Sequence, residues 1–220
     1  KGNLLKYNIK TKSIVGATFT KGDSVGDIHK FCIQITNYLK HNWDFKIAVN
    51  KIVRTEDEVQ CSPRRDYAKS LTSLQKEFDE VVICAGAYTS FLLPQLNIYP
   101  IKGYSVTYYE DDENIPTTSI LDDDAKIVAS PFSNNNFRVA GTAELAGWDD
   151  SIRIDRIKPL RKWVRKNTFV QDSRPDMWAC LRPMTPNMLP ITGKVKGVWV
   201  NSGAGHLGWT MGMALAEKIA

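Results

Sequence analysis

The stretch that decides the fold runs over residues 178–193, WACLRPMTPNMLPITG, and continues over 198–220, VWVNSGAGHLGWTMGMALAEKIA. The apolar letters at 198–200 predict a short β-strand. The glycine-rich letters GAGHLG at 203–208 follow at once, and the pattern over 209–219 predicts a helix. The sequence therefore predicts a strand, a glycine turn and a helix in direct succession.

A glycine turn between a strand and a helix has a chemical use. Glycines let backbone N–H groups come close to a ligand, and the helix N-terminus adds a positive partial charge. Such a turn suits an electron-rich cofactor. An ordinary tight turn has the same glycines, and the glycines alone favour this second interpretation.

The composition is that of an ordinary globular chain. Its 220 residues are 43% apolar and 24% charged, and 29 Lys and Arg against 24 Asp and Glu give a net charge of +5. This mild excess suits an anionic ligand or an anionic membrane surface and falls short of a nucleic-acid signature. No signal peptide is visible in these residues, and no apolar run reaches the ~20 residues that span a bilayer.

Cysteine and histidine usage argues against a metal site. The four cysteines are far apart and form no CxxC pair, and the chain has only three histidines. We therefore expect no metal site, reduced thiols and a cytoplasmic protein.

The first part of the chain contains one clear helix pattern. Apolar residues recur at helical spacing over 24–42, which predicts an amphipathic helix with Asp23 or Ser24 as its N-cap. Residues 51–78 are expected to form an excursion, in which the polar residues 62–78 are either a β-hairpin or a solvated loop.

A buried parallel strand is predicted over 80–86, where four consecutive apolar residues stand together. Its end consists of the small residues Ala85, Gly86 and Ala87. Small residues occur there when a ligand lies against the backbone of a sheet, or when the start of a helix packs closely. Both interpretations apply to this segment.

The second half predicts a separate antiparallel sheet. Residues 99–109 indicate a strand, a glycine kink and a second strand. Shorter strands are expected at 120–121, 126–129 and 137–140, with a hairpin turn at 133–136.

The helix predicted over 155–167 has an apolar face and a basic face. The apolar face consists of Ile154, Ile157, Leu160, Trp163 and Val164. The basic face consists of Arg153, Arg156, Lys158, Arg161, Lys162, Arg165 and Lys166. Such a charge run is usually a solvated face, and a basic amphipathic helix can also rest on anionic lipid.

Five motifs occur in an order and spacing that resemble a known family. They lie at 99–105 (YPIKGYS), 126–144 (KI to GTAE), 181–186 (LRPMTP), 189–193 (LPITG) and 207–211 (LGWTM). The earlier segment from Gly16 to Asp27 is similar as well, so the resemblance covers the chain from about Ile14 to its end. The chain resembles the small subunit of D-amino-acid dehydrogenases, which are FAD-dependent members of the D-amino-acid oxidase superfamily.

The resemblance implies a mixed α/β fold in which a partial, Rossmann-like FAD-binding domain is interleaved with an antiparallel or mixed β-sheet substrate domain. Residues 1–98 would belong mostly to the FAD-binding domain, 99–180 to the substrate domain that caps the flavin, and 181–220 to the FAD-binding domain again. Family members open with a βαβ unit whose GxGxxG motif holds the FAD pyrophosphate. This chain has no such opening unit, and GAGHLG at 203–208 matches the flavin-ring turn instead, so we expect a fragment, the carboxyl-side part of the enzyme.

The resemblance also implies roles for single residues. Arg182 would hold the substrate carboxylate, with a structural arginine as the alternative. Tyr104 would line the substrate pocket, with a core aromatic as the alternative. The implied cofactor-binding residues are Val49, Ala85, Gly86, Ala87, Lys102, Gly103, Gly205, His206, Leu207, Gly208, Trp209 and Thr210.

One motif departs from the family pattern. Relatives often read GHGTLGW where this chain reads GAGHLGW at 203–209, so the histidine falls two places later. His206 then contacts flavin or substrate, or it only hydrogen-bonds a loop carbonyl.

The function implied is FAD-dependent oxidative deamination of D-amino acids to 2-oxo acids and ammonia. One alternative is another flavin amine oxidoreductase, acting on glycine, sarcosine or proline-type substrates. A second is a non-catalytic, truncated remnant without bound flavin. The expected partners are a D-amino acid, a quinone or other membrane electron acceptor and a missing N-terminal segment, with no nucleic acid. The expected location is cytoplasmic or peripheral at the inner membrane.

Overall fold

A computed structural model describes residues 4–10, 14–48, 51–56, 58, 68–110, 113–132 and 135–220 of the chain. By its internal contacts the chain divides into two units. The first unit comprises Lys1–Ile33 and Lys102–Cys180, and the second comprises Gln34–Ile101 and Leu181–Ala220. The predicted boundaries at 98/99 and 180/181 lie near two of these divisions, whereas the first 33 residues group with Lys102–Cys180.

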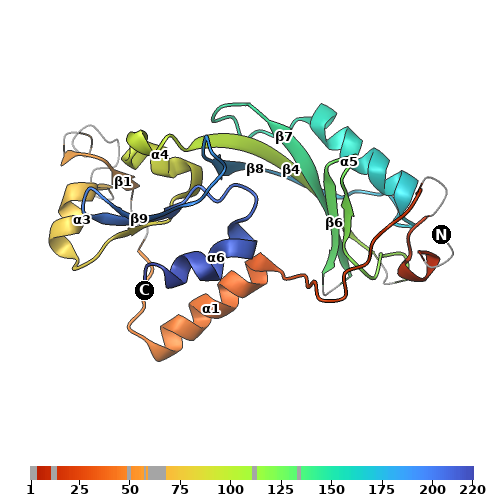
Figure 1. The fold of residues 1–220 in the computed structure, drawn as a ribbon, viewed down its shortest axis with the longest axis horizontal. Helices are drawn as coiled ribbons and strands as arrows, with labels where there is room; N and C mark the ends of the chain where they lie inside the picture. The colour runs from red at the N-terminus through yellow and green to blue at the C-terminus, as the bar shows by residue number, and fades with distance from the viewer. Residues whose placement is uncertain are drawn as a thin grey trace. The chain divides into compact units, whose positions relative to one another are not determined.

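The first unit is built on a five-stranded sheet with the strand order β5-β6-β7-β4-β8 (Figure 1). Its strands are β4 (Tyr99–Tyr109), β5 (Ile120–Asp122), β6 (Ile127–Phe132), β7 (Asn136–Glu144) and β8 (Asp176–Met184). Strands β5, β6, β7 and β4 pair antiparallel in that order, as the sequence predicts. The predicted kink at Gly103 coincides with a register shift between Lys102 and Tyr104, and the strand continues through it.

Helix α5 (Ile154–Asn167) packs on one face of this sheet (Figure 1). Leu160 and Val164 are fully buried among residues of β4, β6 and β7. A Cβ at Gly141 would lie 3.0 Å from Leu160, so the missing side chain lets the helix approach the strand. Ile154, predicted on the apolar face, is 53% exposed, because it stands at the first position of the helix, outside the packed turns.

The N-terminal part contributes η1 (Leu5–Tyr7) and α1 (Ile28–Asn42). The helix begins four residues later than predicted, because Asp27 rather than Asp23 or Ser24 caps it. The Asp27 carboxylate accepts hydrogen bonds from the backbone N–H groups of His29 and Lys30 at 3.0 and 3.2 Å. The amphipathic pattern is present, yet none of the residues of α1 is buried.

The second unit contains a three-stranded sheet with the order β3-β10-β9. Its strands are β3 (Val82–Ile83), β9 (Ile191–Val195) and β10 (Val198–Ser202). Strand β10 runs parallel to β3 and antiparallel to β9, which confirms the predicted parallel strand. Its side chains pack against Leu71 and Leu93 in a separate core.

The strand predicted over 80–86 is shorter than expected. Gly86 has a φ of +56°, which no strand residue adopts, and the chain turns there into η3 (Gly86–Tyr88). Two short helical segments continue, α4 (Thr89–Leu92) and η4 (Pro94–Leu96).

The predicted excursion contains β1 (Lys51–Val53), β2 (Ala68–Ser70) and α3 (Leu71–Glu77). Strands β1 and β2 pair in parallel, and the described part of 62–78 forms a strand and a helix rather than a hairpin. The hydroxyl of Ser70 accepts a hydrogen bond from the N–H of Ser73 at 2.9 Å and caps α3. The final helix, α6, spans Gly208–Glu217. Among the residues described, no helix combines the length and the apolar character needed to cross a bilayer.

Candidate functional site

Two parallel strands of the second unit end side by side. Just beyond their carboxyl ends stand the small residues 85–87 after β3 and the glycine turn 203–208 after β10. The buried hydroxyl of Ser202 donates to the carbonyl oxygen of Gly86 at 2.9 Å and accepts from the hydroxyl of Thr89 at 3.1 Å. These bonds hold the two predicted cofactor segments together.

Gly86 fits a ligand that approaches the backbone. Its φ of +56° lies in the left-handed region that side chains disfavour, and a Cβ built there meets no atom within 4 Å. Open space thus stands beside a glycine at the carboxyl end of a parallel strand. Ligands of open α/β sheets bind in this position.

Gly203 and Gly205 are glycines for a different reason. Their φ angles are +76° and +57°, and a Cβ would lie 2.7 Å from the Thr185 side chain or 2.6 Å from the Met184 sulfur. The absence of side chains therefore lets the turn lie directly against the end of β8. Close packing accounts for these two positions without a ligand.

That packing brings the turn next to the segment with the predicted arginine. The N–H of Gly205 donates to the carbonyl oxygen of Pro183 at 2.9 Å. Arg182, one residue earlier in β8, is half-buried. The buried hydroxyl of Thr185 donates to the carbonyl of Leu189 at 2.8 Å, which fixes the loop that follows.

Residues 206–210 are all exposed, and α6 begins among them. No side chain caps the N-terminus of this helix. The helix adds a positive partial charge at this end, which suits an anion.

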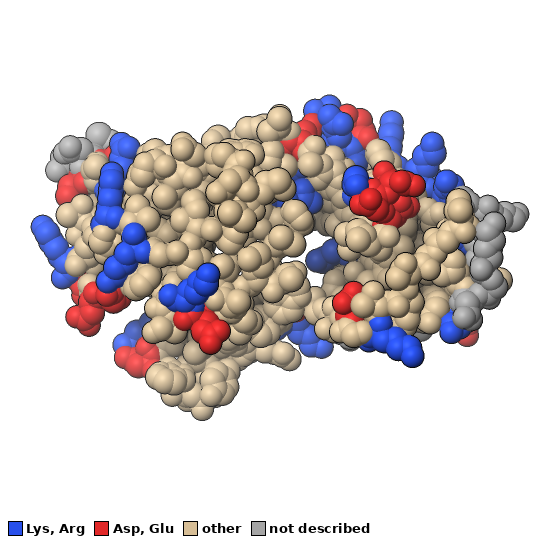
Figure 2. Space-filling view, viewed as in Figure 1, with Lys and Arg blue, Asp and Glu red and all other residues tan. Residues whose placement is uncertain are grey.

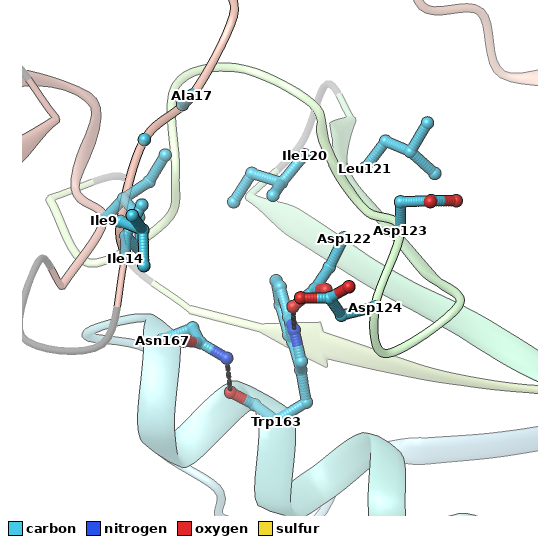
Figure 3. Close-up of a pocket in the computed structure, with 12 residues that line it drawn as sticks. Ile9, Ile14, Ala17, Ile120, Leu121, Asp122, Asp123, Asp124, Trp163 and Asn167 are labelled. Atoms are coloured by element: carbon cyan, nitrogen blue, oxygen red, sulfur yellow. Dashed lines mark hydrogen bonds between the residues drawn. The ribbon is translucent and has the colours of Figure 1, made fainter.

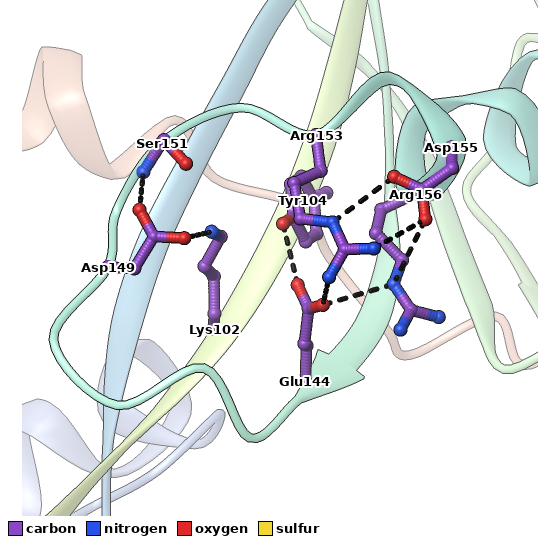
Figure 4. A network of polar contacts seen from close by, with 8 residues as sticks. All are labelled: Lys102, Tyr104, Glu144, Asp149, Ser151, Arg153, Asp155 and Arg156. Carbon is purple, nitrogen blue, oxygen red and sulfur yellow. Dashed lines mark hydrogen bonds and ion pairs between the residues drawn. The ribbon is translucent and has the colours of Figure 1, made fainter.

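The predicted residues Lys102, Gly103 and Tyr104 belong to β4 and are buried. The Lys102 side chain is 0% exposed, and its ammonium is 3.1 Å from the carboxylate of Asp149 (Figure 4). Burial works against this charge, but the side chains of Tyr104 and Asp149 outweigh it and raise the pKa of the Lys102 amine. Hydrogen bonds from Ser151 and then from Lys102 lower the pKa of Asp149 to about 2.

Tyr104 lies in the core, the alternative that the sequence left open for it. Its hydroxyl donates to the carboxylate of Glu144 at 2.7 Å (Figure 4). Glu144 is itself buried and also accepts from Arg153 at 2.7 Å and from Arg156 at 3.2 Å. Burial and then Glu144 raise the pKa of Tyr104, while Tyr104 and then the two arginines lower the pKa of Glu144.

A separate cavity of about 340 Å³ lies in the first unit, between the N-terminal segment, β5 and α5 (Figure 3). Two hydrogen bonds connect polar groups of its lining. The indole N–H of Trp163 donates to Asp122 at 2.7 Å, and Asn167 donates to the Trp163 carbonyl at 3.0 Å. A hydrogen bond from Ala125 and then one from Trp163 lower the pKa of Asp122. None of the predicted site residues lines this cavity.

The structure thus brings together 85–87, 203–208 and the segment at Arg182 within the second unit. Residues 102–104 belong to the first unit, and Val49 lies outside the described residues. Sequence reasoning missed Ser202, which connects the two strand ends. A small polar residue placed directly before the glycine turn was the available signal.

A parallel strand pair that ends in glycine turns is the arrangement of a nucleotide-cofactor domain. A model of the family described as FAD dependent oxidoreductase (DAO) matches residues 5–220, and the chain belongs to this family. The resemblance drawn from the five motifs is therefore confirmed, as are the mixed α/β class and FAD as the cofactor of the family.

Curated relatives are also similar. D-amino acid dehydrogenase 3 of Mesorhizobium japonicum is 40% identical over 93% of this chain and 52% of its own length. D-amino acid dehydrogenase of Vibrio atlanticus is 35% identical over 97% of this chain and 52% of its own. The chain thus spans about half the length of the curated relatives it matches.

Solved structures of the same fold include glycine oxidase from Geobacillus kaustophilus, with a TM-score of 0.54 and 20% identity over 64% of this chain and 40% of that one. Iminodiacetate oxidase from Chelativorans sp. BNC1 has a TM-score of 0.55 and 22% identity over 64% of this chain and 41% of that one. These likenesses show the fold.

Proposed function

We propose that this chain is the carboxyl-side part of an FAD-dependent enzyme that deaminates D-amino acids to 2-oxo acids and ammonia. The observation that carries the proposal is the 40% identity to a D-amino acid dehydrogenase over 93% of the chain. The substrate loses two electrons and two protons to become an imino acid. Water then adds to the imine carbon and releases ammonia.

The residues proposed to hold FAD are 85–87, 205–210, Lys102, Gly103 and Val49. The open space beside the glycine at the end of β3 supports this assignment, because a flat ring needs backbone that no side chain covers. The uncapped N-terminus of α6 would stabilise negative charge on the reduced ring. When bound, the flavin supplies the two-electron oxidation.

Arg182 is proposed to bind the substrate carboxylate. A guanidinium presents two parallel N–H donors that match the two oxygens of a carboxylate. The half-buried position of Arg182 next to the glycine turn supports this role, because partial desolvation strengthens a charge-assisted hydrogen bond.

Tyr104 is proposed to act at the substrate side and His206 at the flavin. The buried hydroxyl of Tyr104 is already committed to Glu144, so it would act as a fixed dipole rather than as a proton carrier. His206 is exposed at the start of α6 and is free to turn toward a ligand bound there.

Substrate profiling tests the reaction. The FAD-loaded protein should reduce an artificial electron-accepting dye with D-alanine at least tenfold faster than with glycine, sarcosine or L-proline. Faster reduction with sarcosine or glycine would assign the chain to the other amine oxidoreductases.

Flavin binding tests the non-catalytic alternative. Because the chain spans about half the length of its curated relatives, we propose that it retains FAD weakly unless a separate N-terminal piece complements it. Absorbance in the flavin bands after gel filtration measures retention. A stoichiometrically yellow preparation of these 220 residues alone would refute weak binding, and no flavin even with the front half of the Mesorhizobium relative would favour a remnant.

The electron acceptor is proposed to be a quinone or another acceptor in the inner membrane, with the protein cytoplasmic and peripheral at that membrane. A faster reoxidation of the reduced protein by a soluble quinone than by dissolved oxygen is the expected result.

A further inference from the structure

The basic face of α5 separates into two sets of residues in the structure. Its four arginines are engaged with carboxylates of the same unit. Arg153 and Arg156 contact Glu144 and Asp155, and Arg161 and Arg165 contact Asp172 at 2.7 and 2.6 Å. Asp172 is only 5% exposed, so its two arginines neutralise a carboxylate that the fold has buried. These four residues stabilise the first unit.

The three lysines of this face are different. Lys158, Lys162 and Lys166 follow at four-residue spacing, so they form one stripe along the helix, with Ile154 at its head. All three are exposed, and within the described part of the chain they make no hydrogen bond or ion pair. The charge of Lys166 contributes to the lowered pKa of Asp122 without a hydrogen bond between them.

Two lysines of this stripe point away from the protein. Each residue advances about 100° around a helix, which places Lys158 and Lys162 opposite the buried residues Leu160 and Val164. Figure 2 shows Lys and Arg side chains standing in a row over the position of α5 in Figure 1.

We propose that this stripe docks the protein on an anionic lipid surface. Three hydrated ammonium groups on flexible stems follow a plane of lipid phosphates without needing a fixed geometry. The apolar side chain at the head of the stripe favours lipid over nucleic acid. Ile154 is 53% exposed there, and it suits the boundary between headgroups and acyl chains.

The proposal deepens the membrane acceptor proposed above and names the surface that would reach it. The proposed function explains why the protein would bind a membrane, but the binding itself does not depend on that function, because binding to vesicles needs neither flavin nor substrate. Failure of vesicle binding would therefore leave the deaminase proposal intact, and failure of catalysis would leave the docking surface intact.

Cosedimentation with vesicles tests it. Each lysine near an anionic surface contributes ~1 kcal/mol, about fivefold in partition coefficient, so K158Q/K162Q/K166Q should bind phosphatidylglycerol-containing vesicles about 100-fold more weakly than the wild type. The charge-preserving variant K158R/K162R/K166R should bind as the wild type does. Raising the salt concentration should weaken wild-type binding, and pure phosphatidylcholine should bind little of any variant.

A matched variant separates the stripe from net charge. Lys21, Lys40 and Lys76 are exposed and, among the residues described, have no side-chain partner, so K21Q/K40Q/K76Q removes the same charge elsewhere. It should keep wild-type vesicle binding. An equal loss in this control, or unchanged binding by K158Q/K162Q/K166Q, would overturn the proposal. Loss of duplex DNA binding with intact vesicle binding in the stripe variant would assign the surface to nucleic acid instead.

Discussion

The N–H of Gly205 donates a hydrogen bond to the carbonyl oxygen of Pro183 at 2.9 Å, and the glycine turn is thereby joined to the strand with Arg182. The two segments lie about 20 residues apart in sequence; the turn is predicted to contact the flavin, and Arg182 to hold the substrate carboxylate. Their backbones are in direct contact within one unit. A substitution in either segment should therefore alter the position of the other segment.

Replacing Arg182 tests its role as the carboxylate clamp. Loss of a desolvated, hydrogen-bonded charge pair costs ~2–5 kcal/mol, so Arg182→Met should lower kcat/KM for D-alanine at least about 30-fold. Arg182→Lys should restore little of it, because an ammonium cannot make the two parallel hydrogen bonds. Dye-linked turnover of the FAD-loaded protein measures both variants. A Lys variant within about threefold of the wild type would assign Arg182 a structural role.

Gly205→Ala should destabilise the fold, because the new Cβ meets the Met184 sulfur at 2.6 Å and the φ of +57° is strained. The left-handed conformation costs about 1–2 kcal/mol for other residues, and the clash adds to it. The double variant Gly205→Ala with Met184→Ala should recover the part of the loss due to the clash. Urea unfolding measures the free energies, and no recovery would mean that backbone strain alone is responsible.

Gly86→Ala should behave differently, since its Cβ would enter open space. We expect a loss of stability of about 1 kcal/mol from its φ of +56° alone, with a larger loss of flavin affinity. Comparison of urea midpoints with flavin fluorescence titrations separates the two effects. Unchanged flavin affinity in the presence of the front half of a relative would remove this glycine from the cofactor site.

The Lys102→Met variant distinguishes a packing role of Lys102 in β4 from a role in cofactor binding. Methionine fills a similar volume without a buried charge, and Asp149 is 51% exposed, so it can regain hydration when its partner is lost. The free energy of unfolding should therefore stay within about 1 kcal/mol of the wild type. Flavin affinity should fall at least tenfold if Lys102 contacts the cofactor as proposed. A destabilised variant with normal flavin affinity would make Lys102 purely structural.

The ion pair at Lys102 also predicts a pH dependence. The pKa of Asp149 is lowered from 3.8 to about 2, so this carboxylate favours the folded state above about pH 4. Its contribution should disappear as the pH falls from about 4 to about 2, because the unfolded chain binds the proton first. Asp149→Asn should flatten the fall in stability over this interval, measured as urea midpoint against pH. Asp150→Asn, which removes the same charge one residue away, should leave the wild-type slope.

Local patterns were enough to predict the parallel strand from its continuous apolar run and α5 from its apolar residues at helical spacing, and the kinked strand was predicted as well. They failed at the boundaries of elements. Strand β3 ends at Ile83, before the turn at Gly86, and the Asp27 carboxylate moves the start of α1. Helix α3 escaped prediction because its seven residues are mostly polar and only Ser70 marks its start.

The sequence proposes the glycines and the arginine of the candidate site because each has a fixed place in a motif, and their roles stay predictions. The surroundings of Tyr104 were not predictable. Whether a strand residue faces a pocket or a core depends on which face of the sheet a helix covers, and α5 lies 50 residues further along the chain. The partners of the arginines in α5 were not predictable either, since Glu144 stands at the end of β7 and Asp172 in the loop after the helix.

Helix α1 buries none of its residues, and an isolated helix of 15 residues is only marginally stable in water. Its amide hydrogens should therefore exchange with deuterium much faster than those of β4, whose central residues are buried. The exposed side chains of Ile33, Ile35 and Tyr38 also favour association of this segment with other apolar surfaces. Light scattering should show self-association that grows with protein concentration, and substituting these three residues with serine should abolish it.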